Sequence, residues 1–181
     1  NMKNLRVEFA DSIEDIGQTH WNNLTGVNNP FTRYEFLHAL EQSGCTTKHS
    51  GWQPHHVAVY EQASTPQTNN ETAAVDDRTL VAIVPLYLKT NSWGEYVFDW
   101  SWANAYQSHG LDYYPKFVTA APFTPSLGER FFIDKKLAEK NPSFESDVLK
   151  LIAEKVKDKA QLIGASSWHV LFPTEQQNTL L

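Results

Sequence analysis

The order of apolar patterns along the chain constrains its fold more than any other feature. Leu5, Val7 and Phe9 alternate with polar residues, which is typical of a strand. Apolar residues then recur at helical spacing over 13–24 and again over 33–43. Two successive helices after a single short strand favour a fold in which helices cover a sheet.

Segments rich in strand-forming residues follow these helices. They are predicted at 55–60, 80–88, 95–100, 116–121 and 167–172. A last helix is predicted over 143–160, with Asn141 as its cap and Pro142 in its first turn. The order β-α-α-β-β-β, closed by β-α-β, predicts the α+β class: a mixed, mostly antiparallel sheet flanked by helices.

Domain organisation follows from length and from one polar segment. A chain of 181 residues fits a single domain with its own core, so residues 1–181 are predicted to form one unit. Residues 61–79 are rich in Ser, Thr, Pro, Gln, Asn and Asp. A segment this polar predicts a mobile hairpin loop between two strands.

Charge and cysteine content exclude several classes of function. The net charge is −6 and no Lys/Arg run exceeds two residues, which argues against DNA as a partner. No apolar run approaches the roughly 20 residues of a membrane helix. A single cysteine, Cys45, excludes an internal disulfide and a cysteine metal cage. These features predict a cytoplasmic protein that makes no membrane contact.

Familiar catalytic and cofactor motifs are absent from the sequence. It contains neither phosphate-binding glycine loop, nor the coenzyme A pyrophosphate loop of acetyltransferases, nor a G-x-S-x-G elbow. His55 and His56 are adjacent on a predicted strand, so they point to opposite faces and cannot share a metal. One of them is expected to be buried and the other accessible. The sequence therefore identifies no catalytic residue, cofactor or metal.

Aromatic residues concentrate in segment 93–114, which holds eight of them with carboxylates interleaved. Flat apolar faces beside a few polar groups are typical of a small-molecule, glycan or peptide pocket. Proline-fixed turns follow at 113–116 and 122–125. The predicted substrate-binding residues are Glu95, Asp99, Trp100, Trp102, Tyr106, Tyr113, Tyr114, Lys116, Phe123 and Thr124.

A plain aromatic core is the alternative interpretation of the same segment. In that case Glu95 and Asp99 are solvated or paired with Lys89 or Lys116.

On one strand the two carboxylates lie roughly 13 Å apart at about 3.3 Å per residue. This exceeds the about 5–9.5 Å that separates the carboxylates of a glycosidase. Each carboxylate is therefore expected to act singly.

Eight segments together resemble one family. In chain order they are Asn29–Phe31, Ala39–Gly44, Gly51–His56, Pro85–Lys89, Gly94–Trp100, Tyr113–Lys116, Pro122–Pro125 and His169–Phe172. This series is similar to the FemAB-like family of bacterial proteins, which is associated with peptidoglycan biosynthesis and recognition. The resemblance covers nearly the whole chain.

The resemblance implies the fold of the Gcn5-related acyltransferases (GNAT), with this chain similar to the first of two such domains. It implies an acyl- or aminoacyltransferase whose donor is acyl-coenzyme A or aminoacyl-tRNA when both domains are present. This half would contribute recognition of the acceptor and would be inactive alone. Its expected partners are its own C-terminal domain, a small-molecule, glycan or peptide acceptor, and a second copy in a homodimer. A non-catalytic recognition module and an acetyl-coenzyme A-dependent N-acetyltransferase are the alternatives.

Overall fold

The computed structural model describes residues 4–63, 77–91, 114–124, 127–171 and 174. The described part forms an α+β structure with two four-stranded sheets, in the orders β1-β3-β4-β7 and β2-β5-β6-β8. The strands are β1 Leu5–Ala10, β2 Trp52–Pro54, β3 His56–Gln62, β4 Arg78–Val84, β5 Tyr87–Lys89, β6 Lys116–Thr119, β7 Phe132–Ile133 and β8 Trp168–Val170. All pairs are antiparallel except β6 and β8, which are parallel. This confirms the predicted class and the mostly antiparallel pairing.

At two places the chain passes directly from a strand of one sheet into a strand of the other. A single residue, His55, separates β2 from β3, and Pro85 and Leu86 separate β4 from β5. The His55 N–H donates to the Leu86 carbonyl oxygen over 2.8 Å, which holds the two crossings together. The predictions of single strands at 55–60 and 80–88 were therefore wrong in their bounds. Proline has no N–H for the strand ladder, so the sheet breaks beside Pro54 and Pro85.

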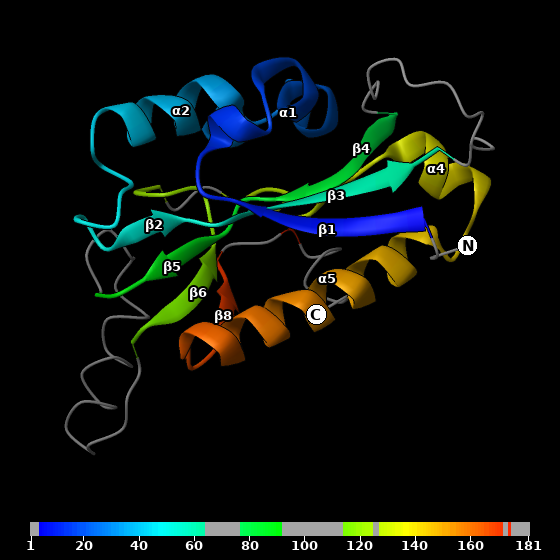
Figure 1. Cartoon of the computed structure of the whole chain (residues 1–181). Helices are drawn as coiled ribbons and strands as arrows, with labels where there is room; N and C mark the ends of the chain where they lie inside the picture. The colour runs from blue at the N-terminus through cyan, green and yellow to red at the C-terminus, as the bar shows by residue number, and fades with distance from the viewer. Residues whose placement is uncertain (1–3, 64–76, 92–113, 125–126, 172–173, 175–181) are drawn as a thin grey trace, which may run out of the picture.

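Helices cover both faces of the sheets (Figure 1). On one side, α1 (Gln18–Thr25) and α2 (Tyr34–Gln42) bury Trp21 and Leu37 against Ile83. On the other side lies α5 (Phe144–Ile163), whose inner stripe of Val148, Ile152 and Val156 packs in one cluster with buried residues of β3 and β4. Because strand residues alternate between faces, β3 and β4 contribute side chains both to the core under α1 and α2 and to the core under α5.

The first predicted helix, 13–24, is interrupted. Residues Ile13–Asp15 form a 3₁₀ turn, η2, which Ser12 caps, since its Oγ accepts from the Glu14 N–H over 3.1 Å. Helix α1 begins only after Gly17, which has φ +96°. This left-handed backbone, which glycine tolerates, turns the chain between the two pieces.

The second predicted helix is present, but Thr32, which is followed by Glu35 three residues on, does not cap it. Thr32 lies in a preceding 3₁₀ turn, η3 (Pro30–Thr32), and its hydroxyl donates to the Asn29 carbonyl. Arg33 is the N-cap of α2, without a side-chain hydrogen bond. Glu35 accepts hydrogen bonds from Gln18 and Asn22 of α1 instead of capping α2. The reason is that η3 precedes α2, which therefore begins one residue later than predicted.

The last predicted helix is confirmed as α5, although it continues past 160 to Ile163 and ends at Gly164 in the left-handed conformation. Its predicted cap was wrong, because Asn141 ends a short preceding helix, α4 (Lys135–Lys140). Helix α4 and strand β7 were not predicted. Asp134 caps α4 by accepting from the Lys136 and Leu137 N–H groups.

The bounds of the predicted loop, 61–79, were too wide. Glu61 pairs with Thr79 and Gln62 with Arg78 in the β3–β4 ladder, so both ends of the predicted loop are strand. The predicted strand 95–100 lies outside the described residues. Within the described residues, no helix is both long and apolar enough to cross a membrane.

Candidate functional site

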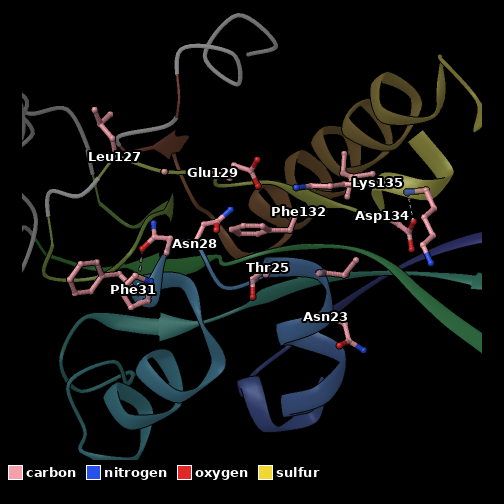
Figure 2. A pocket seen from close by; sticks show the side chains of 16 residues that line it. Asn23, Thr25, Asn28, Phe31, Leu127, Glu129, Phe132, Asp134 and Lys135 are labelled. Atoms are coloured by element: carbon pink, nitrogen blue, oxygen red, sulfur yellow. Dashed lines mark hydrogen bonds between the residues drawn. The ribbon is translucent and has the colours of Figure 1, made fainter. Parts of the chain in front are cut away.

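A groove lies between the C-terminal end of α1 and the segment that leads into β7 and α4 (Figure 2). Its main hollow has a volume of about 710 Å³. A second hollow of about 300 Å³ shares Asn23, Leu24 and Asp134 with it and extends towards the start of β4. We call the two together the α1–β7 groove.

The lining of the groove combines amide, hydroxyl and charged groups with apolar ones. The main hollow is lined by Asn23, Leu24, Thr25, Gly26, Asn28, Asn29, Pro30, Phe31, Leu127, Gly128, Glu129, Phe132, Ile133, Asp134, Lys135 and Lys136. The second hollow adds His20, Arg78, Thr79 and Leu80. Polar groups beside apolar ones orient a bound small molecule.

The first wall of the groove is formed by the turn that follows the end of α1. Gly26 has φ +70° and ψ −163°, a conformation essentially restricted to glycine, and its N–H donates to the Asn22 carbonyl. The Arg33 guanidinium donates to the Gly26 carbonyl over 3.0 Å. Asn29 Oδ1 then accepts from the Phe31 N–H, which starts η3. The sequence therefore turns sharply and presents 23–31 as one curved wall.

The opposite wall approaches this turn closely. A Cβ atom on Gly128 would lie 2.4 Å from Asn29 Nδ2, so only glycine fits there without movement. Further along, the Asp134 N–H donates to the Val81 carbonyl, which fixes the start of α4 to the sheet. Both walls are thus held by backbone contacts on either side of the hollow.

Several polar groups of the groove are available to a ligand. The Asn23 and Asn28 side chains are exposed and have no protein partner in the described part of the chain. Thr25 Oγ1 is buried, and no described residue bonds to it. Glu129 and Lys135 are exposed on the facing wall (Figure 2). These groups favour hydrogen bonding and ion pairing with a polar ligand.

An apolar rim lies at one end of the groove. Leu127 is 72% exposed and Phe31 is 37% exposed, and both line the main hollow. Val27, which is 79% exposed, lies in the sequence between Gly26 and Asn28, which line the wall formed by 23–31. Large exposed side chains grouped at the mouth of a hollow are typical of interaction sites.

Six of the ten predicted site residues lie outside the described residues, and their role stays a prediction: Glu95, Asp99, Trp100, Trp102, Tyr106 and Tyr113. The other four, Tyr114, Lys116, Phe123 and Thr124, lie in β6 or in the segments beside it. None of them lines the α1–β7 groove. Lys116 is fully buried, with its Nζ 5.1 Å from the centre of the Tyr114 ring. The Phe123 ring packs 5.4 Å from that of Trp52, and the Thr124 N–H donates to the Ala121 carbonyl.

Lys116 belongs to a row of neighbours across the second sheet. It pairs with Lys89 on β5, and Lys89 pairs with Trp52 on β2. Both lysines are fully buried, and Lys89 Nζ lies 4.1 Å from the centre of the Trp52 ring. Because like charges opposite one another are unfavourable, this row requires compensation by aromatic faces and acceptors. The predicted pairing of Glu95 or Asp99 with these lysines lies outside the described residues.

Both adjacent histidines are buried, so the expectation that one is accessible was wrong. His56 Nδ1 accepts from the Leu86 N–H over 3.3 Å, so its Nε2–H donates to Glu41 Oε2 over 3.2 Å. His55 lies at the sheet bend, 3.7 Å from Asp11, and burial lowers the pKa of its imidazole. No group of three or more metal-binding side chains occurs in the described part of the chain.

Sequence reasoning did not identify the groove residues. Asn23 and Thr25 read as the polar face of a helix, and 127–136 contain no strong motif. The available signal was the stop after α1, where Gly26 is followed by Asn28, Asn29 and Pro30. That signal marks a turn but does not reveal which segment faces it.

Comparisons with known proteins give one match. The profile of the FemAB-like family, described as peptidoglycan biosynthesis/recognition, matches residues 12–181. Searches of curated proteins and of solved structures each found no match. The family match covers both walls of the groove and the β6 region.

Proposed function

Because this chain belongs to the FemAB-like family of peptidoglycan biosynthesis and recognition, we propose that it binds the acceptor molecule of an acyl- or aminoacyltransferase. The acceptor is a peptidoglycan-type molecule that carries peptide and sugar parts. The chain supplies recognition, and the transfer step requires a second domain, its own C-terminal partner.

The observation that carries this proposal is the α1–β7 groove. It is open to solvent, and it holds carboxamides that have no partner among the described residues, beside apolar side chains. Nothing in its described lining pairs a hydroxyl or thiol with a histidine or carboxylate in the way that an activated nucleophile requires. The lining therefore supports binding better than it supports chemistry within this chain.

The β6 region extends the same proposal. Tyr114, Phe123 and Thr124 are partly exposed and offer the acceptor a second contact, whereas Lys116 is fully buried. The role of the six predicted residues of 95–113 stays a prediction. The rings of Tyr114 and Phe123 contribute flat apolar faces.

Two alternatives from the sequence remain open. A non-catalytic recognition module would bind the same molecule without any transfer. An N-acetyltransferase would require a site for acetyl-coenzyme A, and the chain has no glycine loop shaped for pyrophosphate. A GNAT-like arrangement of the sheets is part of the proposal, and it is supported by the order of helices and strands.

The test is a binding measurement with groove variants. Purified chain is titrated with a muropeptide by calorimetry, and Asn28→Trp is compared with Lys157→Trp. Both positions are exposed, but only Asn28 lines the groove. We expect Asn28→Trp to weaken binding at least tenfold because the indole fills the hollow, and Lys157→Trp to leave binding unchanged. Equal affinity of both variants would show that the groove is not the acceptor site.

A further inference from the structure

Strand β8 lies at the end of its sheet, so one of its edges has no strand beside it in the described part of the chain. On its inner edge the Ser167 carbonyl accepts from β6 over 2.8 Å, and the Leu171 N–H donates to β6 over 2.9 Å. In a strand ladder, alternate residues bond to the same neighbouring strand. The N–H and C=O groups of Trp168 and Val170 therefore point away from β6, along the open edge.

The open edge of β8 carries no feature that discourages pairing. No described residue hydrogen-bonds to the outward main-chain groups of Trp168 and Val170. Proteins protect exposed strand edges with lysine, proline or a bulge, whereas β8 reads Trp-His-Val and keeps a regular register with β6. An extended peptide that adds as a further strand would satisfy both donors and both acceptors.

A hollow of about 580 Å³ follows this edge between β8 and α5. Trp168 and Val170 turn their side chains to the α5 face, where both pack against the core cluster, so His169 between them faces the other way. All three residues line the same hollow. The hollow therefore extends round the edge of the strand and leaves room for a peptide beside it.

The wall of the hollow is apolar and held in place. On α5, Ser146 and Ala153 are exposed, and these small side chains line the hollow on either side of Leu149. The ring of Phe131 meets that of Trp168 edge-to-face, with the ring centres 5.8 Å apart. The indole of Trp168 also donates to a threonine hydroxyl of β6 over 2.9 Å. Side chains of an added strand would thus meet a preformed apolar surface.

The charge of the hollow favours an acidic occupant. Lys150 is exposed and is the one lysine or arginine among the described residues that line the hollow. The described lining holds no carboxylate. The other basic side chain is that of His169, whose Nε2 lies 2.9 Å from Ser167 Oγ. A carboxylate of the occupant pairs with the Lys150 ammonium, whereas a lysine at the same place is repelled.

From these observations we infer that the open edge of β8 is a docking site for an extended acidic segment of a separate partner protein. The segment adds to the sheet as a further strand, and its main chain bonds to the outward groups of Trp168 and Val170. On the side that faces α5, an apolar side chain rests on Leu149 and Ala153. A carboxylate two residues along the segment lies on the same side and pairs with Lys150. This site shares no lining residue with the α1–β7 groove.

A synthetic capped peptide serves as the probe, with threonine at every second position and valine and glutamate alternating between the threonines. Calorimetry with the purified chain should show saturable binding below about 1 mM. Glutamine in place of glutamate should weaken binding about threefold, the effect of one partly exposed ion pair. Methylation of every peptide nitrogen should abolish binding, because no N–H then remains to pair with β8.

Amide hydrogen exchange shows where the peptide binds. Bound peptide should slow the exchange of one outward N–H, that of Val170, by about tenfold or more, because this group gains an acceptor. The Leu171 N–H already donates to β6, so its exchange should change little. Equal slowing of both amides would overturn the addition of a strand at this edge.

Variants on the exposed side of α5 test the hollow without touching the core. Ala153→Trp should fill the hollow and weaken binding by about tenfold or more. Asp158→Trp, at an exposed position that does not line the hollow, should leave binding unchanged. Lys150→Glu should reverse the preference, so that a peptide with lysine in place of glutamate binds more tightly. Lys155→Glu, also exposed and outside the lining, should keep the original preference.

The remaining outcomes identify other occupants of the edge. If the chain sediments as a dimer and Ala153→Trp makes it a monomer, a second copy occupies the edge. If the chain joined to its C-terminal partner domain no longer binds the peptide, that domain occupies the edge. Either result would overturn the separate partner, as would the absence of saturable binding or equal affinity for the methylated peptide. Muropeptide binding in the α1–β7 groove is measured independently, so the proposed function stands or fails separately.

Discussion

At the scale of single residues, His55 shows how a bend in the backbone determines the charge state of a side chain. It separates β2 from β3, and its ring packs edge-to-face on Phe117 with 11% of its side chain exposed. Burial lowers the pKa of its imidazole, and Asp11 only partly offsets this. The buried ring therefore favours the neutral form.

Acidification should destabilise the protein through His55. In the unfolded chain the pKa returns to its ordinary value of 6.5, so the unfolded state binds the proton more readily. Stability should therefore fall as pH drops below about 6.5 towards the lowered folded value. The check is the change in Tm between pH 7.5 and pH 5.5, which should be smaller in His55→Gln than in the native chain. His49→Gln, at an exposed histidine, is the control, and an equal reduction in both variants would refute the assignment.

At the scale of elements, Glu35 joins the two helices that form one face of the protein. Its Oε1 accepts from Gln18 Nε2 over 2.9 Å and from Asn22 Nδ2 over 2.8 Å, so α2 holds both turns of α1. The hydrogen bond from Gln18 is the largest of several contributions that lower the pKa of this carboxyl to about 2. Because α1 carries one wall of the groove, this contact also positions Asn23.

Glu35 should make the α1–α2 contact sensitive to acid. A lowered pKa means that its contribution to stability is present above about 4.5 and is lost as pH falls towards about 2. Glu35→Gln keeps an acceptor but removes the charge, so its urea midpoint should change less between pH 5 and pH 3 than that of the native chain. Glu139→Gln, at an exposed carboxylate on α4, should behave like the native chain. If Glu35→Gln retains the full pH dependence, the carboxylate does not join the helices in solution.

The sequence was sufficient for the elements with strong periodicity and insufficient where proline or glycine divides them. The inner stripe of α5 was predictable from Val148, Ile152 and Val156, because helical spacing reports burial directly. The apolar run 80–88 reads as one strand, yet Pro85 sends its two halves into different sheets. The groove was not predictable, because its walls, 23–31 and 127–136, are at least 96 residues apart in the sequence and their approach depends on tertiary packing.

At the scale of the whole molecule, one buried carboxylate connects the helical layer to the junction of the two sheets. Glu41 on α2 is 8% exposed at its side chain, and its Oε1 accepts from the Ile13 N–H over 2.9 Å. Its Oε2 accepts from His56 Nε2–H, and His56 Nδ1 accepts from Leu86 in the β4–β5 crossing. Four segments distant in the sequence thus meet in one chain of hydrogen bonds.

Removing the Glu41 charge should destabilise the whole fold. Hydrogen bonds to a charged group contribute about 1.5–3 kcal/mol, so Glu41→Gln should lower the free energy of unfolding by about that amount. Glu41→Leu should lower it further, because the Ile13 N–H and the His56 Nε2–H would both lose their acceptor in a buried site. Urea denaturation of both variants measures the effect, with Glu154→Gln as the control at an exposed carboxylate on α5. The unfolding should remain a single transition, since the helical layer and both sheets share this contact. A loss below about 0.5 kcal/mol in Glu41→Leu, the range of ordinary surface substitutions, would mean that core packing alone holds the helical layer to the sheets.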